Sequence, residues 1–124
     1  MAKIWIVEDD LNLANLTKTV LVDKGFEVEI FYEAPKAIEE AKKTRPDLIL
    51  MDVSLPGIDG ADAIRQLKKL PALRDVPVIF LTGLISNKEG GQEGMGIFID
   101  GVKYKTLGKP YEIEQLLEMI EKII

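Results

Sequence analysis

Acidic residues end two apolar runs of the chain, where their type and position could support metal or phosphoryl chemistry. The strand-like run over residues 4–7 leads directly into Glu8, Asp9 and Asp10. Asp52 ends a second run, "PDLILM". Two unit charges about 4 Å apart repel by about 4 kcal/mol at an effective dielectric of roughly 20. Carboxylates that meet at one place therefore raise one another's pKa or require a cation.

The elements that must position these acids follow from the apolar pattern of the rest of the chain. Short apolar runs predict strands over residues 3–7, 26–32, 46–52, 76–82 and 104–107. Helical periodicity predicts helices over residues 11–24, 34–44, 59–70 and 111–124. Strands that alternate with helices predict an α/β fold, with a parallel sheet covered by helices on both faces. Ligands of such sheets bind beyond the carboxyl ends of the strands.

Five polar residues lie at those carboxyl ends, and they are Glu8, Asp9, Asp52, Thr82 and Lys109. If the first and third strands are neighbours, Asp9 and Asp52 converge at one rim with Glu8 beside them. Mg²⁺ is the cation we expect there, because it binds through one or two carboxylates, keeps several waters and leaves room for a phosphoryl group. Lys109 adds a fixed positive charge.

A single acid after a strand also has a simpler interpretation, as a helix cap or a solvated turn residue. We assign that role to Asp10 and to Asp59, because each directly precedes or begins an expected helix. The simpler interpretation does not account for acids, a threonine and a lysine that all occupy strand ends.

The composition excludes several kinds of chemistry. The 124 residues contain no cysteine and no histidine, which excludes disulfides, thiolate nucleophiles, imidazole metal ligands and a Ser-His-Asp triad. The net charge of -5 argues against nonspecific binding to nucleic acid or to an anionic membrane. No run approaches the roughly 20 apolar residues of a membrane helix, and the first run lacks the basic flank of a secretion signal. We therefore expect one cytoplasmic domain over residues 1–124.

Four segments, in their order and spacing, resemble the response-regulator receiver domain of two-component signalling. They are "IWIVEDD", "DLILMDVSLPGIDG", "VPVIFLTG" and "GKPY", which together span nearly the whole chain. The resemblance implies a flavodoxin-like, doubly wound fold similar to that of chemotaxis regulators. Its sheet would have five parallel strands in the order 2-1-3-4-5, flanked by five helices.

The resemblance also implies a phosphoacceptor site. Asp52 would be the nucleophile that accepts a phosphoryl group from a partner histidine kinase or phosphotransfer protein. The hydroxyl of Thr82 and the ammonium of Lys109 would each contact a phosphoryl oxygen, and the Lys109–Pro110 peptide bond would be cis. Mg²⁺ would be the cofactor, held by Glu8, Asp9, Asp52 and the backbone carbonyl of Ser54. The only enzyme activity implied is Mg²⁺-dependent self-phosphorylation from small phosphodonors, with slow self-dephosphorylation.

The segment after the fourth expected strand departs from the family pattern. Four glycines between residues 90 and 96 would cost a helix roughly 3–4 kcal/mol relative to alanine, so we expect the family's fourth helix to be short, irregular or missing. The pair Asp100-Gly101 between β-prone arms predicts a β-hairpin that leads into the last strand. A mobile glycine loop is the alternative interpretation.

A second departure concerns the aromatic ring that commonly stands three residues before the family's lysine. This chain has Thr106 at that position, with Tyr104 two residues earlier. A threonine cannot carry an apolar ring into a pocket. Either Tyr104 replaces the ring, or the output surface changes by another route.

Two function hypotheses follow. The first is a phosphorylatable receiver that switches a protein-interaction surface toward an unidentified output protein or domain. The second is a degenerate receiver, which keeps the fold and binds partners independently of phosphate. We expect no nucleic-acid or membrane binding by this domain, and a weak homodimer through the final helix or the glycine-rich segment.

An enzyme or cofactor binder on the same architecture is disfavoured. Three acids occupy the place where a phosphate-binding loop would follow the first strand. The chain contains neither dinucleotide-binding nor nucleotide-triphosphate glycine motifs. A metal phosphohydrolase that used Asp52 would need a second acid two residues later, where Ser54 stands.

Overall fold

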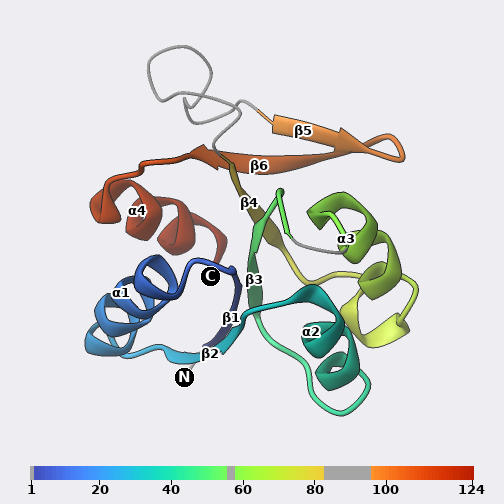
Figure 1. The fold of residues 1–124 in the computed structure, drawn as a ribbon, viewed down its shortest axis with the longest axis horizontal. Coiled ribbons are helices and arrows are strands. Elements are labelled where there is room, and N and C mark those ends of the chain that lie inside the picture. Colours follow the sequence, from blue (N-terminus) through green and yellow to red (C-terminus); the bar gives the residue numbers. More distant parts are fainter. Residues whose placement is uncertain (1, 56–57, 83–95) are drawn as a thin grey trace.

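The structure is a computed structural model of the chain, and it describes residues 2–55, 58–82 and 96–124. One sheet lies between two layers of helices (Figure 1). The strands are β1 (Lys3–Val7), β2 (Glu27–Phe31), β3 (Leu48–Asp52), β4 (Val78–Thr82), β5 (Gly96–Ile99) and β6 (Val102–Gly108). The helices are α1 (Leu11–Asp23), α2 (Ala34–Ala41), α3 (Gly60–Lys68) and α4 (Ile113–Ile123), with a short 3₁₀ helix, η1 (Pro71–Leu73).

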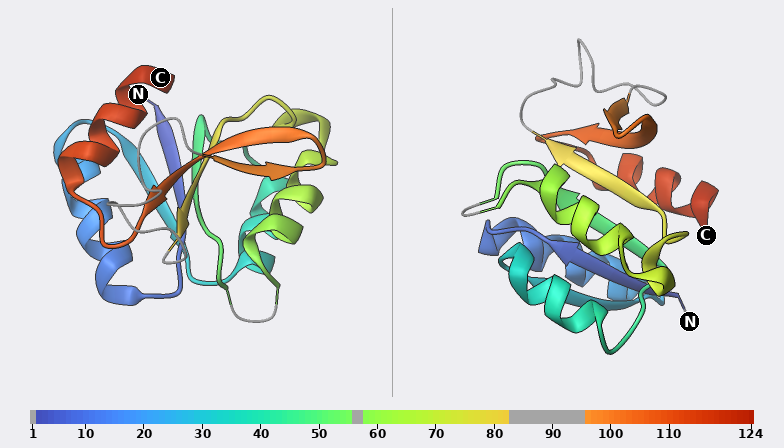
Figure 2. Two further views of the ribbon diagram at one scale, coloured as in Figure 1. Left: turned by 90° about the horizontal axis from the view of Figure 1, so that it is seen from above. Right: turned by 90° about the vertical axis from the view of Figure 1, so that its right-hand side faces the viewer.

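The strand order is β2-β1-β3-β4-β6-β5, and every neighbouring pair is parallel except β5 with β6. Helices α1 and α4 cover one face of the sheet, while α2 and α3 cover the other (Figures 1 and 2). The α/β fold and the order of its five parallel strands are as the sequence predicted, with β6 in fifth place. None of the helices in the described ranges is long and apolar enough to cross a membrane.

The burial pattern explains which strands stand where. Every residue of β3 and β4 is buried, as expected for central parallel strands that helices cover on both faces. In β2 the glutamates are exposed and the apolar residues are half-buried, which fits an edge strand with one wetter face. The core is divided by the sheet into two apolar clusters, one under α2 and α3 and the other under α1 and α4.

Local signals set the starts of two helices. The carboxylate of Asp10 accepts a hydrogen bond from the backbone N–H of Leu13, at 3.1 Å, and caps α1. The carboxylate of Asp59 accepts one from the N–H of Asp62, at 2.8 Å, and caps α3. Both assignments from the sequence are confirmed.

The predicted hairpin is also present. Asp100 and Gly101 have φ angles of 52° and 82°, the left-handed pair that a two-residue hairpin turn requires. The first arm of the hairpin is itself a strand, so β5 adds a sixth, antiparallel member to the edge of the sheet. The described part of the chain holds four α-helices, where the resemblance implied five. Most of the glycine-rich segment, residues 83–95, lies outside the described residues.

Candidate functional site

The register of the parallel strands brings distant polar residues to one rim of the sheet. Val7 pairs with Met51, so the residues that follow them, Glu8 and Asp52, lie at the carboxyl ends of neighbouring strands. Thr82 pairs with Gly108, which places Lys109 at the same rim. The backbone N–H of Lys109 donates to the carbonyl of Thr82 at 2.8 Å and fixes this end of the sheet.

Lys109 joins two buried carboxylates. Its ammonium nitrogen, Nζ, donates to Glu8 Oε1 at 2.5 Å and to Asp52 Oδ2 at 3.2 Å. Glu8 is 1% exposed and Asp52 is 5% exposed, so water screens these contacts only weakly. The lysine therefore balances much of the negative charge of the pair.

Backbone N–H groups hold the second oxygen of each carboxylate. The N–H of Asp10 donates to Glu8 Oε2 at 3.1 Å, and the N–H of Ser54 donates to Asp52 Oδ1 at 3.0 Å. Each buried carboxylate thus has a cation on one side and a peptide group on the other. This arrangement fixes the orientation of both acids.

Protonation at the site follows from its burial. Burial raises the pKa of Glu8 to about 7 from an ordinary value of 4.5; the neighbouring Asp52 adds to the rise, and hydrogen bonds from Lys109 and Asp10 oppose it. Burial alone would lower the pKa of Lys109, but the hydrogen bonds and charges of Glu8 and Asp52 outweigh it and raise that pKa. Lys109 therefore stays protonated, and without a metal ion Glu8 is divided between its protonated and ionised forms near neutral pH.

The three acids fit a divalent cation. Glu8, Asp9 and Asp52 each offer a carboxylate oxygen, and these oxygens all lie within 4.8 Å of one another. All of the donors are hard oxygens, and Asp9 is exposed, so the group opens to solvent. This is the donor set that Mg²⁺ prefers when it keeps several of its waters.

The remaining residues expected at the site have mixed outcomes. Thr82 is buried at the end of β4, and the Lys109–Pro110 bond is cis as expected. The metal role of the Ser54 carbonyl stays a prediction. Thr106 is buried in β6, and its neighbour Tyr104 packs edge-to-face on Phe80 with ring centroids 5.6 Å apart.

The sequence did not indicate the importance of Gly60. A Cβ atom added there would lie 2.5 Å from the backbone oxygen of Asp52 and 3.0 Å from Val53 Cα. Only glycine allows the first turn of α3 to approach the Asp52 backbone this closely. The segment "SLPGIDG" predicted a turn. It did not predict the contact between Gly60 and the Asp52 backbone, because that contact depends on how α3 packs against the end of β3.

A second feature that the sequence did not indicate ties the lysine loop to α1. The hydroxyls of Thr17 and Tyr111 are 2.9 Å apart and share a hydrogen bond. Burial raises the pKa of Tyr111, while the bond to Thr17 opposes the rise. Because Tyr111 is two residues after Lys109, this bond positions the loop that carries the lysine.

Comparison with known proteins places these observations in a family. The family model of the response regulator receiver domain matches residues 4–121. A probable transcriptional regulator of Porphyra purpurea, ycf29, is 34% identical over 123 residues, which are 98% of this chain and 56% of that protein. The chain spans about half the length of the curated relatives it matches.

Solved structures of similar proteins share the fold. The chemotaxis response regulator CheY4 of Vibrio cholerae is 26% identical, with a TM-score of 0.84 over 100% of this chain and 99% of that one. The receiver domain of sensor histidine kinase PA1611 from Pseudomonas aeruginosa is 27% identical, with a TM-score of 0.81 over 98% and 96% of the two chains. That domain has a magnesium ion coordinated in its active-site cleft. With the family match over almost its full length, this chain belongs to the response regulator receiver domain family.

Proposed function

We propose that residues 1–124 form one receiver domain, which accepts a phosphoryl group on Asp52 from a histidine kinase or phosphotransfer protein. The observation that carries the proposal is the environment of the Asp52 carboxylate. Ser54 N–H and Lys109 Nζ contact its two oxygens, and Glu8 and Asp9 lie beside it. This combination orients a buried carboxylate as a nucleophile next to a fixed cation.

The transfer exchanges one bond to phosphorus for another. A carboxylate oxygen of Asp52 attacks the phosphorus of a phosphohistidine on the partner, the P–N bond breaks, and an acyl phosphate forms while the imidazole leaves. Lys109 pairs with a phosphoryl oxygen, and its raised pKa keeps it charged throughout. Thr82, buried at the adjacent strand end, donates its hydroxyl to another phosphoryl oxygen.

Glu8, Asp9, Asp52 and the carbonyl of Ser54 would hold Mg²⁺. When bound, Mg²⁺ neutralises charge on the transferring group, which is most of what catalysis of such a loose, in-line transfer requires. The same site supports slow transfer of the phosphoryl group to water, and phosphorylation from small donors without a kinase. The domain is not an enzyme beyond these reactions on itself.

The output of the switch is a protein-interaction surface. Tyr104 replaces the ring that the family places at the position of Thr106. It lies on the same face of β6 as Thr106, because side chains two residues apart in a strand share a face. Its contact with Phe80 of β4 couples the hairpin to the strand that ends at Thr82.

A degenerate receiver is the second candidate, and the same position favours it. With Thr106 in place of an aromatic ring, and a hairpin at the sheet edge, the usual readout of the phosphorylated state is altered. In this case the domain would bind its partner equally well with and without phosphate on Asp52.

Chemical phosphorylation separates the two candidates. The chain is incubated with Mg²⁺ and acetyl phosphate, and its peptides are mapped by mass spectrometry; a second sample with Mg²⁺ and beryllofluoride, which mimics the phosphoryl group without transferring one, is followed by fluorescence. We expect acetyl phosphate to add the mass of one phosphoryl group to Asp52, absent in Asp52→Asn and without Mg²⁺. Trp5 is a probe of the state, since it is fully buried in β1, three residues before Glu8, and stacks edge-on against Phe31. A chain that gains neither the mass nor a Mg²⁺-dependent change in Trp5 emission is a degenerate receiver.

A further inference from the structure

The hairpin of β5 and β6 diverges from the rest of the sheet toward its Asp100-Gly101 turn. Strand β6 pairs with β4 from Lys105 to Gly108, but from Val102 to Lys105 it pairs with β5. Before Lys105, the chain therefore leaves β4, and the tip of the hairpin reaches over α3 (Figures 1 and 2). This divergence opens a space between the hairpin on one side and α3, η1 and the start of β4 on the other.

Two adjoining hollows fill that space, and we call them together the hairpin groove. They measure about 460 and 340 Å³ and share Lys68, Val102 and Tyr104 in their walls. The apolar part of the lining comes from both sides of the groove and from the end of α4, and its members include Ile64, Val76, Pro77, Val78, Ile99 and Ile123. Val102 is 52% exposed at the hairpin tip. An apolar side chain of a partner could be buried there.

The charges around the groove are mostly of one sign. Six basic residues line the two hollows, against two acidic ones, Asp75 and Asp100, in a chain whose net charge is -5. The basic residues are Arg65, Lys68, Lys69, Arg74, Lys103 and Lys105. The groove therefore carries a formal excess of four positive charges while the chain as a whole is acidic.

Two of the six have structural roles. Arg65 pairs with Asp62 at 2.6 Å and with Asp100 at 3.2 Å. The ammonium of Lys68 donates to three backbone carbonyls, those of Leu73, Arg74 and Val76, which ties α3 to η1 and the start of β4. These contacts fix one wall of the groove.

The other four basic residues are available to a ligand. Lys69, Arg74, Lys103 and Lys105 are exposed, and none of them makes an ion pair within residues 2–55, 58–82 and 96–124. They stand on both walls, two from the α3–η1 side and two from β6. A ligand in the groove would thus meet positive charge on either side of an apolar floor.

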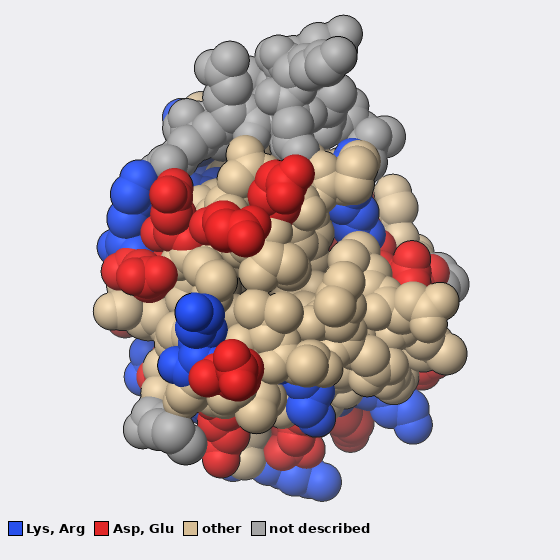
Figure 3. All heavy atoms as spheres, turned by 90° about the vertical axis from the view of Figure 1, so that its left-hand side faces the viewer, with Lys and Arg blue, Asp and Glu red and all other residues tan. Residues whose placement is uncertain are grey.

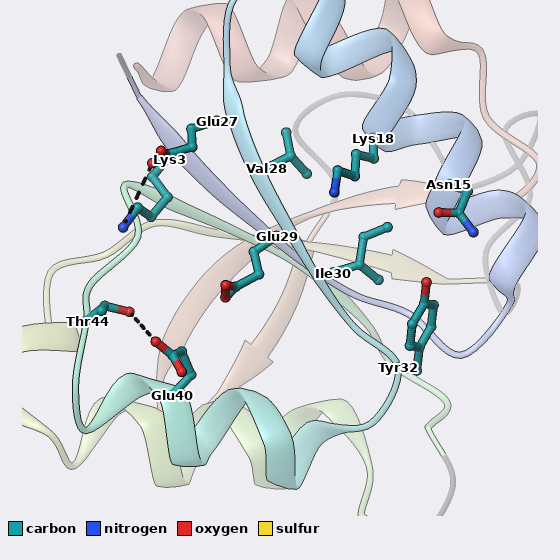
Figure 4. A pocket seen from close by; sticks show the side chains of 10 residues that line it. All are labelled: Lys3, Asn15, Lys18, Glu27, Val28, Glu29, Ile30, Tyr32, Glu40 and Thr44. Atoms are coloured by element: carbon teal, nitrogen blue, oxygen red, sulfur yellow. Dashed lines mark hydrogen bonds and ion pairs between the residues drawn. The ribbon is translucent and has the colours of Figure 1, made fainter.

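Another hollow, on the opposite edge of the sheet, lacks this asymmetry. It measures about 520 Å³ and runs along the edge strand β2 (Figure 4). Its charges are mixed and partly satisfied, because Lys3 pairs with Glu27 at 3.9 Å and Thr44 donates to Glu40 at 3.1 Å. Its charge pattern therefore indicates no one kind of ligand.

We propose that the hairpin groove binds an acidic segment of a partner protein, which inserts an apolar side chain between the hairpin and α3. Carboxylates of the segment pair with Lys69 and Arg74 on one wall and with Lys103 and Lys105 on the other, and the apolar residue covers Val102 and Tyr104. The groove lies at the amino ends of β4 and β6, and Asp52 and Lys109 lie at the carboxyl ends. Docking in the groove thus uses a different part of the fold from phosphoryl transfer.

The groove fits a protein segment better than nucleic acid. Its apolar floor matches the buried centre of a protein interface, where charged residues form the rim.

A second copy of this chain is the other occupant to consider. Figure 3 shows the face that α1 and α4 cover, on which acidic side chains gather, and α4 carries exposed Glu114, Glu118 and Glu121. Docking that face into the groove would join unlike surfaces and lead to rings or open chains of molecules.

The test selects the ligand from an unbiased pool. The chain is immobilised and a random peptide library displayed on phage is enriched on it; selected peptides are then labelled and their binding measured by fluorescence anisotropy. We expect the selected peptides to combine Asp and Glu with one large apolar residue, and to bind more weakly at higher salt. Replacement of two exposed lysines, Lys103→Glu with Lys105→Glu, should weaken binding roughly tenfold or more.

Two further variants make the result specific. Lys69→Glu with Arg74→Glu changes the opposite wall and should weaken binding to a similar extent, which covers the case in which the hairpin variant fails to fold. Lys36→Glu with Lys43→Glu lies on and just after α2, causes the same change in net charge, and should bind as the wild type does. Circular dichroism verifies the fold of each variant.

Several outcomes would overturn the proposal. One is a library that yields no acidic consensus; another is peptide binding that all three variants weaken equally. Tighter binding of a labelled DNA duplex than of any peptide, lost in the groove variants, would identify a nucleic-acid site instead. Self-association in analytical ultracentrifugation that the groove variants alone abolish would identify a second copy of the chain as the occupant.

Discussion

Lys109 Nζ lies 3.2 Å from Asp52 Oδ2, although 57 positions separate the two residues in the chain. The same nitrogen contacts Glu8, so a single ammonium serves two buried carboxylates from neighbouring strands. The backbone of Lys109 is also fixed, because its N–H donates to the backbone carbonyl of Thr82. Its charge is therefore already in place for the phosphoryl group that we propose on Asp52.

Removal of that charge should slow phosphorylation. Lys109→Met keeps much of the side-chain volume but leaves a phosphoryl oxygen without its cation. We expect the rate of Asp52 phosphorylation by acetyl phosphate to fall roughly 10²-fold, as when one preorganised donor is lost. Lys105→Met, an exposed lysine on the same strand, is the control and should react at the wild-type rate. Equal rates for all three proteins would show that Lys109 only balances charge in the resting state.

The stability of the metal-free chain should depend on pH through Glu8. Its pKa in the folded state, about 7, is above the ordinary value of 4.5, so the folded chain binds the proton more tightly than the unfolded chain does. The contribution of Glu8 to stability is then fully present below pH 4.5 and is lost as the pH rises through about 7. Thermal unfolding in the presence of a chelator, over this pH range, measures the loss, and Glu8→Gln should remove that part of the dependence.

The same proton should compete with Mg²⁺. Below pH 7, a metal ion must displace the proton from Glu8, so we expect the apparent affinity to fall by roughly tenfold for each pH unit. Calorimetric Mg²⁺ titrations at pH values below, at and above 7 provide the measurement. An affinity that stays constant across this range would mean that Glu8 does not take part in metal binding.

Substitution of Gly60 should disturb the backbone of Asp52 through the contact between α3 and the end of β3. In Gly60→Ala the new Cβ would meet the Asp52 backbone oxygen at 2.5 Å, so the strand end or α3 must shift. We expect a loss of about 1–3 kcal/mol in the free energy of unfolding, together with slower phosphorylation of Asp52.

Gly25→Ala is the matched control for this prediction. Gly25 has a φ of 99°, and a Cβ there meets nothing within 4 Å among the described residues. Alanine should cost about 1–2 kcal/mol through backbone strain alone and leave phosphorylation unchanged. If Gly60→Ala behaved in the same way, the close approach of α3 would have no bearing on the site.

Lys68 should stabilise the fold more than an exposed lysine does. Its ammonium donates to three carbonyls around η1, and Lys68→Met would leave those acceptors without their charged donor. We expect a loss of about 1.5–3 kcal/mol in urea denaturation. Lys69→Met, at the next and exposed position, should change stability by about 0.5 kcal/mol or less. Equal effects at the two positions would contradict a structural role for Lys68.

Much of this molecule was determined by short-range features of the sequence. The helix caps Asp10 and Asp59 act through hydrogen bonds to residues three positions later. The Asp100-Gly101 turn likewise depends on the backbone angles of two adjacent residues. The local sequence is therefore enough to predict the caps and the turn. Continuous apolar runs predicted the central strands in the same way. Once the strands are parallel, the polar residues at their carboxyl ends lie along one rim of the sheet, so the sequence is enough to group the acids with the lysine.

The tertiary structure decided what those residues do to one another. The burial of Glu8, and with it a pKa near 7, depends on the elements packed above it. The close approach of Gly60 to Asp52 and the bond between Thr17 and Tyr111 join separate elements. The sequence likewise predicted the hairpin but not the groove beneath it, because the point at which β6 leaves β4 depends on packing against α3. Distances between residues far apart in the chain arise only when whole elements pack, and local sequence signals do not carry them.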